Sequence, residues 1–215
     1  CELQSRNVFL WLCGVDPKDE YTTNTYWGSF LDEGFDKHMK EVWGLESVDI
    51  VIGNPPYQDL PKSHITKTSG SVIWDKFVNK SINLIANSGY LVFVHPSIWR
   101  KPINNKTKII DTLSLFKQYN LIYLEIHDTK DGMKTFNAGT RYDFYCLQKN
   151  NNYKNTTIKD ELGKVSIINI KTMPFIPNKN IDKVISLIGD DKISVIFDSS
   201  YHASRDYISS IKDDK

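Results

Sequence analysis

The residues best suited to chemistry in this chain form a short polar sequence, Asn54-Pro55-Pro56-Tyr57, named here the NPPY loop. It follows residues 48–53, an apolar run typical of a buried parallel strand. Two consecutive prolines lack the backbone N–H groups that a sheet needs, so they end the strand and fix the path of the chain that leaves it. We therefore expect a rigid polar loop at the carboxyl edge of a sheet, where open α/β folds bind their ligands.

The NPPY loop offers two hydrogen-bond acceptors and one aromatic ring. The side-chain amide oxygen of Asn54 stands next to the backbone carbonyl of Pro55, and two adjacent acceptors suit a substrate that carries an NH₂ group. Tyr57 adds a flat face on which a planar ring can stack. The alternative interpretation is a strand-ending turn around a buried tyrosine.

Length and charge limit the classes of protein to consider. The 215 residues, 40% of them hydrophobic, suit one full domain or one domain with part of another. The net charge is +1, so no global field favours nucleic acid, and contact with DNA would need local patches or protein outside this chain. A local basic cluster, formed by Arg100, Lys101, Lys106 and Lys108, is either a phosphate contact or a solvated loop and helix start.

The remaining composition points to no metal, disulfide or membrane chemistry. Cys1, Cys13 and Cys146 have neither zinc spacing nor a disulfide framework, and the five histidines are dispersed. No apolar run approaches a membrane span and no secretory signal is recognised, so we expect a cytoplasmic protein without a membrane partner. The sequence opens at a cysteine, in what looks like the middle of a fold, and we expect a fragment.

Helical and strand patterns alternate along the first 150 residues. The patterns predict strands over 25–31, 48–53, 90–94, 121–126 and 142–147, helices over 4–13, 71–87 and 105–119, and a polar loop over 58–70. Gly89 is expected to close the second helix. Alternating strands and helices imply parallel pairing, but no helix is predicted between the last two strands, which should therefore be antiparallel. The prediction is an α/β fold whose sheet is mostly parallel, with one reversed strand near the end.

The pattern changes after Asn150-Asn151-Asn152. Strand candidates at 164–170 and 195–197 flank a short amphipathic helix over 181–188. We therefore place a domain boundary near residue 150, with one domain over 1–149 and the start of another over 150–215.

The NPPY loop and the segments around it resemble the N6-adenine DNA methyltransferases of restriction–modification systems. The resemblance runs over most of residues 1–149. The segment 71–100, with His95-Pro96-Ser97 at the end of its strand, resembles the family's helix-then-strand unit, and 135–149 resembles the loop and final strand that close the target-base pocket. The resemblance implies a Rossmann-like methyltransferase sheet, incomplete at its N-terminus, and makes 150–215 the start of a target-recognition region.

The resemblance also implies roles for single residues on the substrate side. Asn54 and the Pro55 backbone would hold the adenine amine, and Pro56 belongs to the same catalytic loop. Tyr57 would stack on the flipped base. Phe136 would be the second aromatic, on the opposite face of the base.

On the cofactor side, the resemblance implies binding of S-adenosyl-L-methionine near Glu2, Ser29, Phe30 and Asn54. Glu2 would bind the ribose hydroxyls, although its charge could instead complement a helix N-terminus. Ser29 stands where the family usually has an aspartate. The family's glycine-rich cofactor loop has no match in this chain and is expected upstream of Glu2.

The implied reaction is methyl transfer from S-adenosyl-L-methionine to the N6 amine of adenine in double-stranded DNA, with the target base flipped out of the duplex. The alternatives are an amino-methyltransferase that acts on a protein glutamine or an RNA base, and a non-catalytic DNA-binding or specificity module. A restriction nuclease domain or subunit is a further partner expected outside this chain.

Overall fold

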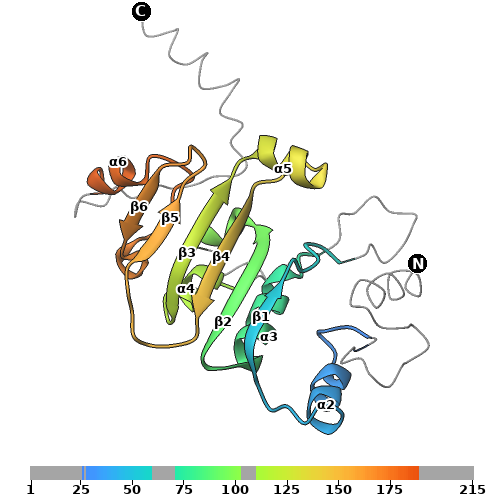
Figure 1. Ribbon diagram of the computed structural model, residues 1–215. Coiled ribbons are helices and arrows are strands. Elements are labelled where there is room, and N and C mark those ends of the chain that lie inside the picture. The colour runs from blue at the N-terminus through green and yellow to red at the C-terminus, as the bar shows by residue number, and fades with distance from the viewer. Residues whose placement is uncertain (1–25, 27, 60–70, 103–109, 189–215) are drawn as a thin grey trace, which may run out of the picture. The chain divides into compact units, whose positions relative to one another are not determined.

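A computed structural model describes residues 26, 28–59, 71–102 and 110–188, and the fold is given for these ranges (Figure 1). Six strands form one sheet in the order β1-β2-β4-β3-β5-β6. The strands are β1 (Val48–Gly53), β2 (Ile85–Pro96), β3 (Asn120–His127), β4 (Tyr142–Gln148), β5 (Thr156–Lys159) and β6 (Val165–Ile168). The helices are α2 (Glu33–Glu41), α3 (Trp74–Leu84), α4 (Thr112–Phe116), α5 (Thr129–Phe136) and α6 (Ile181–Ser186), with 3₁₀ turns η2 (Ser97–Arg100) and η3 (Ile170–Thr172).

The strand directions confirm the predicted α/β sheet. β1 runs parallel to β2, and β3 runs parallel to β5. β4 lies between β2 and β3 and is antiparallel to both, and β6 is antiparallel to β5. Four strands therefore share one direction, and β4 is the reversed strand that the sequence predicts at the end of the first segment. Because β1, β2 and β3 share a direction, their carboxyl ends lie at one edge of the sheet.

One face of the sheet carries the core. Helices α3 and α4 both lie on one side of the sheet (Figure 1). Trp74, Val78 and Ile82 recur every four residues along α3 and are fully buried, as the predicted amphipathic pattern requires. Trp74 stacks on His95 of β2, and the His95 ring in turn contacts Tyr145 of β4 edge-on. This packing fixes the strand ends that carry the candidate site.

The strand β1 forms where predicted but is not buried. Ile50 and Ile52 are 59% and 76% exposed, because β2 is the only neighbour of β1 among the described residues. The predicted strand over 25–31 is wrong in its described part. Ser29 instead opens a turn in which its Oγ accepts from Leu31 N and its carbonyl accepts from Asp32 N, and helix α2 follows. Serine hydroxyls favour such turns over strands.

Helix α3 and strand β2 meet at a different point from the predicted one. The helix ends at Leu84 and β2 begins at Ile85, so Gly89 does not close the helix but lies inside the strand. A Cβ added at Gly89 would lie 2.6 Å from the carbonyl oxygen of Asp49 and 2.5 Å from the Ile85 side chain. The glycine is therefore required by the close approach of β1 and β2, where the register of their pairing shifts.

A helix that the sequence did not predict separates β3 from β4. Asp128 begins α5 by accepting from the backbone N–H groups of Lys130 and Asp131, and Asn137 ends it in the left-handed conformation. The expectation of a helix-free connection is therefore wrong, although the antiparallel pairing of β3 with β4 is confirmed. Gly132 within α5 lowers the helix propensity of this segment, so the sequence pattern did not indicate a helix.

The other predicted elements fall partly outside the described residues. α4 covers five residues of the helix predicted over 105–119, while 103–109 lie outside the description. β6 and α6 lie within the segments predicted as 164–170 and 181–188, and β5 is an additional strand. The helix expected over 4–13, most of the loop over 58–70 and the strand over 195–197 are not described. The sheet belongs to a compact unit that ends at Ile181, and a second unit begins at Asp182. A recognition region over 150–215 stays a prediction.

Candidate functional site

The NPPY loop leaves the carboxyl end of β1 and presents its polar residue to solvent. Asn54 is exposed, Pro55 is buried and Tyr57 is half-buried. A hydrogen bond fixes the C-terminal end of the loop, because Ile73 N, just before α3, donates to the Tyr57 carbonyl over 3.3 Å. Gln58 also pairs with Val72 in an antiparallel bridge. The expected rigid loop is thus tied to the start of α3 as well as to the end of β1.

A large cavity opens on one side of the loop, with a volume of about 760 Å³. It brings together five of the residues singled out in the sequence, Asn54, Pro55, Pro56, Tyr57 and Phe136, although Phe136 lies almost 80 positions further along the chain. Its other lining residues are Gln58, Val72, Trp74, Pro96, Ile98, Ala138 and Thr140. The volume lies within the range of about 300–1,000 Å³ that is usual for small-molecule sites.

Aromatic side chains form much of the wall of the large cavity, and neighbouring rings hold two of them. Trp74 stacks on His95 with ring centroids 4.4 Å apart and planes 16° apart. Phe136 contacts Tyr142 edge-on at 4.9 Å. The Tyr57 hydroxyl is buried with no hydrogen-bond partner among the described residues, and burial raises the pKa of Tyr57. The cavity therefore offers flat apolar surfaces beside the acceptors of the NPPY loop.

His95, the last residue before the proline that ends β2, supports the wall of the cavity. Its Nδ1 lies 3.0 Å from the Pro96 carbonyl oxygen and therefore carries the proton, so Nε2 accepts from the Tyr145 hydroxyl at 3.1 Å. Burial lowers the pKa of His95 to about 4. The ring is therefore neutral near pH 7, and it positions Trp74 and the turn after β2.

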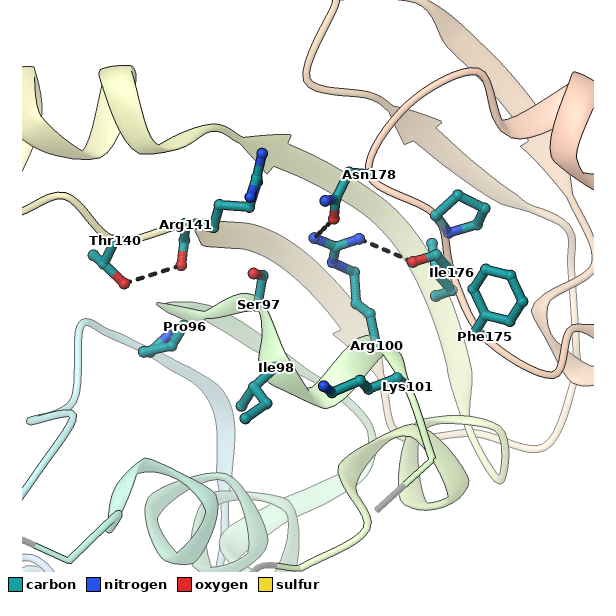
Figure 2. Close-up of a pocket in the computed structure, with 11 residues that line it drawn as sticks. Pro96, Ser97, Ile98, Arg100, Lys101, Thr140, Arg141, Phe175, Ile176 and Asn178 are labelled. Atoms are coloured by element: carbon teal, nitrogen blue, oxygen red, sulfur yellow. Dashed lines mark hydrogen bonds between the residues drawn. The ribbon is translucent and has the colours of Figure 1, made fainter. Parts of the chain in front are cut away.

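A buried ion pair fastens the turn after β2. Arg100 Nε donates to Asp143 Oδ2 of β4 over 2.8 Å, and both side chains are almost fully buried. The same guanidinium donates to the Ile176 carbonyl over 2.9 Å and to Asn178 Oδ1 over 2.7 Å (Figure 2). Burial raises the pKa of Asp143 to about 6, against the opposing effect of the Arg100 charge. Arg100 thus joins η2, β4 and the segment 176–178.

This arrangement separates the members of the predicted basic cluster. Arg100 is 3% exposed, so it is neither part of a solvated loop nor an accessible phosphate contact. Lys101 is exposed, and Lys106 and Lys108 lie outside the described residues. The four cationic residues are close together in the sequence, but Arg100 is buried in an ion pair whereas Lys101 is exposed to solvent.

A small cavity of about 280 Å³ also adjoins the NPPY loop. Phe30 and Asn54, both expected on the cofactor side, line it, and Phe30 stacks on Phe77 with ring centroids 5.5 Å apart. Ser29 lies in the exposed turn next to Phe30 and is not among the lining residues, and Glu2 lies outside the described residues. The rest of the lining consists of Val51, Ile52, Gly53, Pro55, Pro56, Phe77, Ser81 and Phe93. Asn54 is thus shared by both cavities.

Several lining residues were not singled out in the sequence. Ile98 follows the carboxyl end of β2, and Thr140 precedes β4, whose start lies at the same edge because that strand is reversed. The rule that ligands bind at the carboxyl edge of parallel strands could have indicated Ile98. Thr140 and Phe93 carry no sequence signal of their own, since only the strand order brings them beside the NPPY loop.

The described part of the chain was also compared with what a metal site and a membrane-spanning helix require. No group of three His, Cys, Asp or Glu side chains there could hold a metal ion. Each helix in the described ranges is also too short or too polar to cross a membrane.

Comparison with known proteins gives a family match. Residues 18–136, more than half of the chain, match the model of the Eco57I restriction-modification methylase family. An uncharacterized adenine-specific methylase of Mycoplasma pneumoniae is 29% identical over 105 residues, which cover 46% of this chain and 24% of that protein. The chain thus matches about a quarter of the length of this relative.

Solved structures give weaker likenesses. The type I restriction-modification methyltransferase subunit from Streptococcus thermophilus is 16% identical, with a TM-score of 0.47 and coverage of 82% of this chain and 37% of that chain. The M protein of the type I restriction enzyme EcoKI is 15% identical, with a TM-score of 0.46 and coverage of 66% and 29%. At these identities and scores, neither likeness carries an argument about function.

Proposed function

Because the chain belongs to the Eco57I restriction-modification methylase family, we propose that it is part of an enzyme that methylates the N6 amine of adenine in DNA. The supporting observation is that Asn54, Pro55, Tyr57 and Phe136 line one cavity, while Asn54 also lines the small cavity that adjoins the NPPY loop. The Mycoplasma relative is named as an adenine-specific methylase. The activity is proposed for the longer protein, in which a recognition region and a restriction nuclease are further proposed partners.

The proposed role of the NPPY loop is to activate a weak nucleophile. The lone pair of the adenine N6 is delocalised into the ring, so the amine reacts poorly when planar. Asn54 Oδ1 and the Pro55 carbonyl would accept hydrogen bonds from its two N–H groups, which favours a pyramidal nitrogen. The same oxygens would stabilise the positive charge that grows on the nitrogen in the transition state. Exposure of Asn54 between the two cavities suits this role.

The aromatic walls of the large cavity suit a base that has left the duplex. A base within the helix cannot reach the NPPY loop, and flipping it out costs a few kcal/mol. Stacking on an aromatic side chain is worth about 1–3 kcal/mol per base, which offsets part of that cost. Tyr57 and Phe136 are the residues proposed to supply this stacking.

The small cavity fits part of the proposed cofactor. S-adenosyl-L-methionine would supply a methyl group carried on a sulfonium sulfur. Phe30 offers an aromatic surface and Asn54 a polar one in the lining, so these residues would hold the cofactor. The volume of about 280 Å³ lies just below the range of about 300–1,000 Å³ for ligand sites, so further contacts must complete the site. Glu2 and Ser29 stay proposed contacts.

The proposal is tested with the full-length protein, isotope-labelled S-adenosyl-L-methionine and plasmid DNA. Nucleoside analysis of the DNA product is expected to show label in N6-methyl-2′-deoxyadenosine, and sequencing maps the methylated site. Structured RNA and glutamine-containing peptides serve as parallel substrates. Label that enters RNA or peptide instead of DNA, or no transfer to any of the three, would overturn the proposal.

A further inference from the structure

A third opening, the basic pocket, adjoins the large cavity and has a volume of about 610 Å³ (Figure 2). Both share Pro96, Ile98 and Thr140 as lining residues, so they are neighbours at the same edge of the sheet. The remaining lining residues of the basic pocket are Ser97, Arg100, Lys101, Arg141, Phe175, Ile176, Pro177 and Asn178. The basic pocket is therefore within reach of a chain-like molecule that has one part in the large cavity.

The lining of the basic pocket includes three cations and no carboxylate. Arg100 is neutralised from behind by the buried Asp143. Arg141 remains 41% exposed while its Nε donates to Glu161 over 3.2 Å, which leaves its other N–H groups free of that contact. Lys101 is exposed and has no ion-pair partner among the described residues. Lys101 and Arg141 are therefore the charges that an anion can reach.

Hydrogen bonds within the protein hold two walls of the basic pocket together. Arg100 donates to the Ile176 carbonyl over 2.9 Å, and Ile176 N donates back to the Arg100 carbonyl over 2.8 Å. These reciprocal bonds hold the segment 175–178 against η2. Phe175 and Ile98, 37% and 43% exposed, consequently provide apolar surface next to the charges. Figure 2 shows Lys101 and Ile98 together on the η2 side and Phe175 on the facing segment.

We propose that the basic pocket binds the DNA backbone next to the flipped nucleotide, with Lys101 and Arg141 contacting phosphate oxygens and Phe175 and Ile98 packing against the adjoining sugar. This inference rests on the proposed function of the large cavity. A sugar–phosphate chain matches a pocket that combines accessible cations with apolar walls. With a net charge of only +1, the chain as a whole attracts DNA weakly, and a local group of cations is a contact by which it can hold the DNA backbone.

The test compares the full-length protein with Lys101→Gln, Arg141→Gln and the double variant. Each lost phosphate contact is expected to reduce the slope of log affinity against log salt by about 0.9, and the double variant should raise the KM for DNA on the order of 10-fold. The kcat at saturating DNA should change little, because neither side chain lines the large cavity. Lys37→Gln is the matched control, since Lys37 is an exposed lysine on α2 that lines neither opening.

Unchanged salt slopes in the double variant, or equal losses in Lys37→Gln, would overturn the inference. If the unmodified protein methylates adenine while the variants match it, only the phosphate site is wrong. If the unmodified protein methylates no DNA, the proposed function itself has failed.

A second measurement locates the contact. Duplexes with the mapped site carry neutral methylphosphonate links beside the target adenine. This change should weaken binding to the unmodified protein but cause no further loss in the double variant. Additive losses would place Lys101 and Arg141 elsewhere on the DNA and overturn the inference.

Discussion

Prolines follow two strand ends at the same edge of the sheet, but the polar residues beside them differ in exposure. After β1, two prolines leave Asn54 exposed between two cavities. After β2, Pro96 lies between His95 and Arg100, which are 0% and 3% exposed and make hydrogen bonds from every side-chain nitrogen. The first end leaves the polar atoms of Asn54 accessible beside two cavities, whereas the polar side chains at the second end form internal hydrogen bonds that hold the structure.

The difference shows that residue type alone does not identify a functional residue at this edge. His95 and Arg100 are the kinds of side chain usually sought in an active site, yet both are buried and support the structure. Asn54 is uncharged and is the residue that faces open space. Exposure next to a cavity therefore separates the two roles, and substitutions at the two strand ends should fail in different ways.

The largest effect on folding is expected at the end of β2. Arg100→Met should lower the free energy of unfolding by about 3–5 kcal/mol, because it leaves Asp143 buried without its ion-pair partner. Urea unfolding of the full-length protein measures this. The double variant Arg100→Met/Asp143→Leu should recover most of the loss, since an apolar pair removes the unpaired charge. A single variant as stable as the unmodified protein would contradict the supporting role of Arg100.

The largest effect on catalysis is expected at the end of β1. Asn54→Ala should reduce methyl transfer about 100- to 1,000-fold, the usual result of losing one preorganised hydrogen bond to developing charge. Stability should change little because Asn54 is exposed. Calorimetry should show a much smaller loss of cofactor affinity than of activity, because Phe30 and the other lining residues of the small cavity remain in place. Asn54→Asp keeps an acceptor oxygen and should retain part of the activity. Equal losses of catalysis and cofactor binding in Asn54→Ala would remove the assigned role.

A smaller effect is expected from the aromatic wall beside Asn54. Tyr57→Ala should weaken the flipped state of the base by about 1–3 kcal/mol, the value of one stacking contact. A fluorescent adenine analogue at the target site reports the flipped state. Tyr57→Phe should behave like the unmodified protein, because the hydroxyl that it removes has no partner among the described residues. A fluorescence signal unaffected by Tyr57→Ala would exclude Tyr57 as the stacking residue.

The effect with the smallest change per step, about 1 kcal/mol per pH unit, concerns the dependence of stability on pH. The pKa of His95 is about 4 in the folded protein and near 6.5 when unfolded, so between these values the unfolded chain binds a proton that the native chain does not. Its contribution to the free energy of unfolding should therefore fall by about 1 kcal/mol per pH unit as the pH drops from 6.5 to 4. Asp143 acts in the opposite sense, since its folded pKa of about 6 exceeds the unfolded value of 3.8.

The difference between the unmodified protein and His95→Gln isolates the histidine, because Asp143 is present in both. Urea unfolding at pH 7, 6 and 5 should show the stability advantage of the unmodified protein shrinking as the pH falls. A constant difference would mean that His95 titrates normally and is not held neutral by burial.

Part of the site follows from local sequence. Apolar runs identified β1 to β4, although the bounds of β2 were wrong by several residues, and the proline pair correctly indicated where β1 ends. Helix α5 was missed because its cap at Asp128 is a weak signal and Gly132 interrupts its pattern. The exposure of β1 was also missed, since an apolar run does not reveal how many neighbours a strand has.

By itself, the sequence determined strands β1 to β4, helix α3 and the polar loop, because hydrophobic periodicity and proline act over a few residues and need no distant partner. Only the tertiary structure decided that Phe136 lines the same cavity as Asn54, and that Arg100 is buried while the adjacent Lys101 is exposed. Insertion of the reversed strand β4 between β2 and β3 produces both outcomes, since it brings Thr140, Arg141 and Asp143 to the carboxyl edge of the parallel strands. Contacts that arise from the strand order join residues far apart in the chain, so no local sequence pattern predicts them.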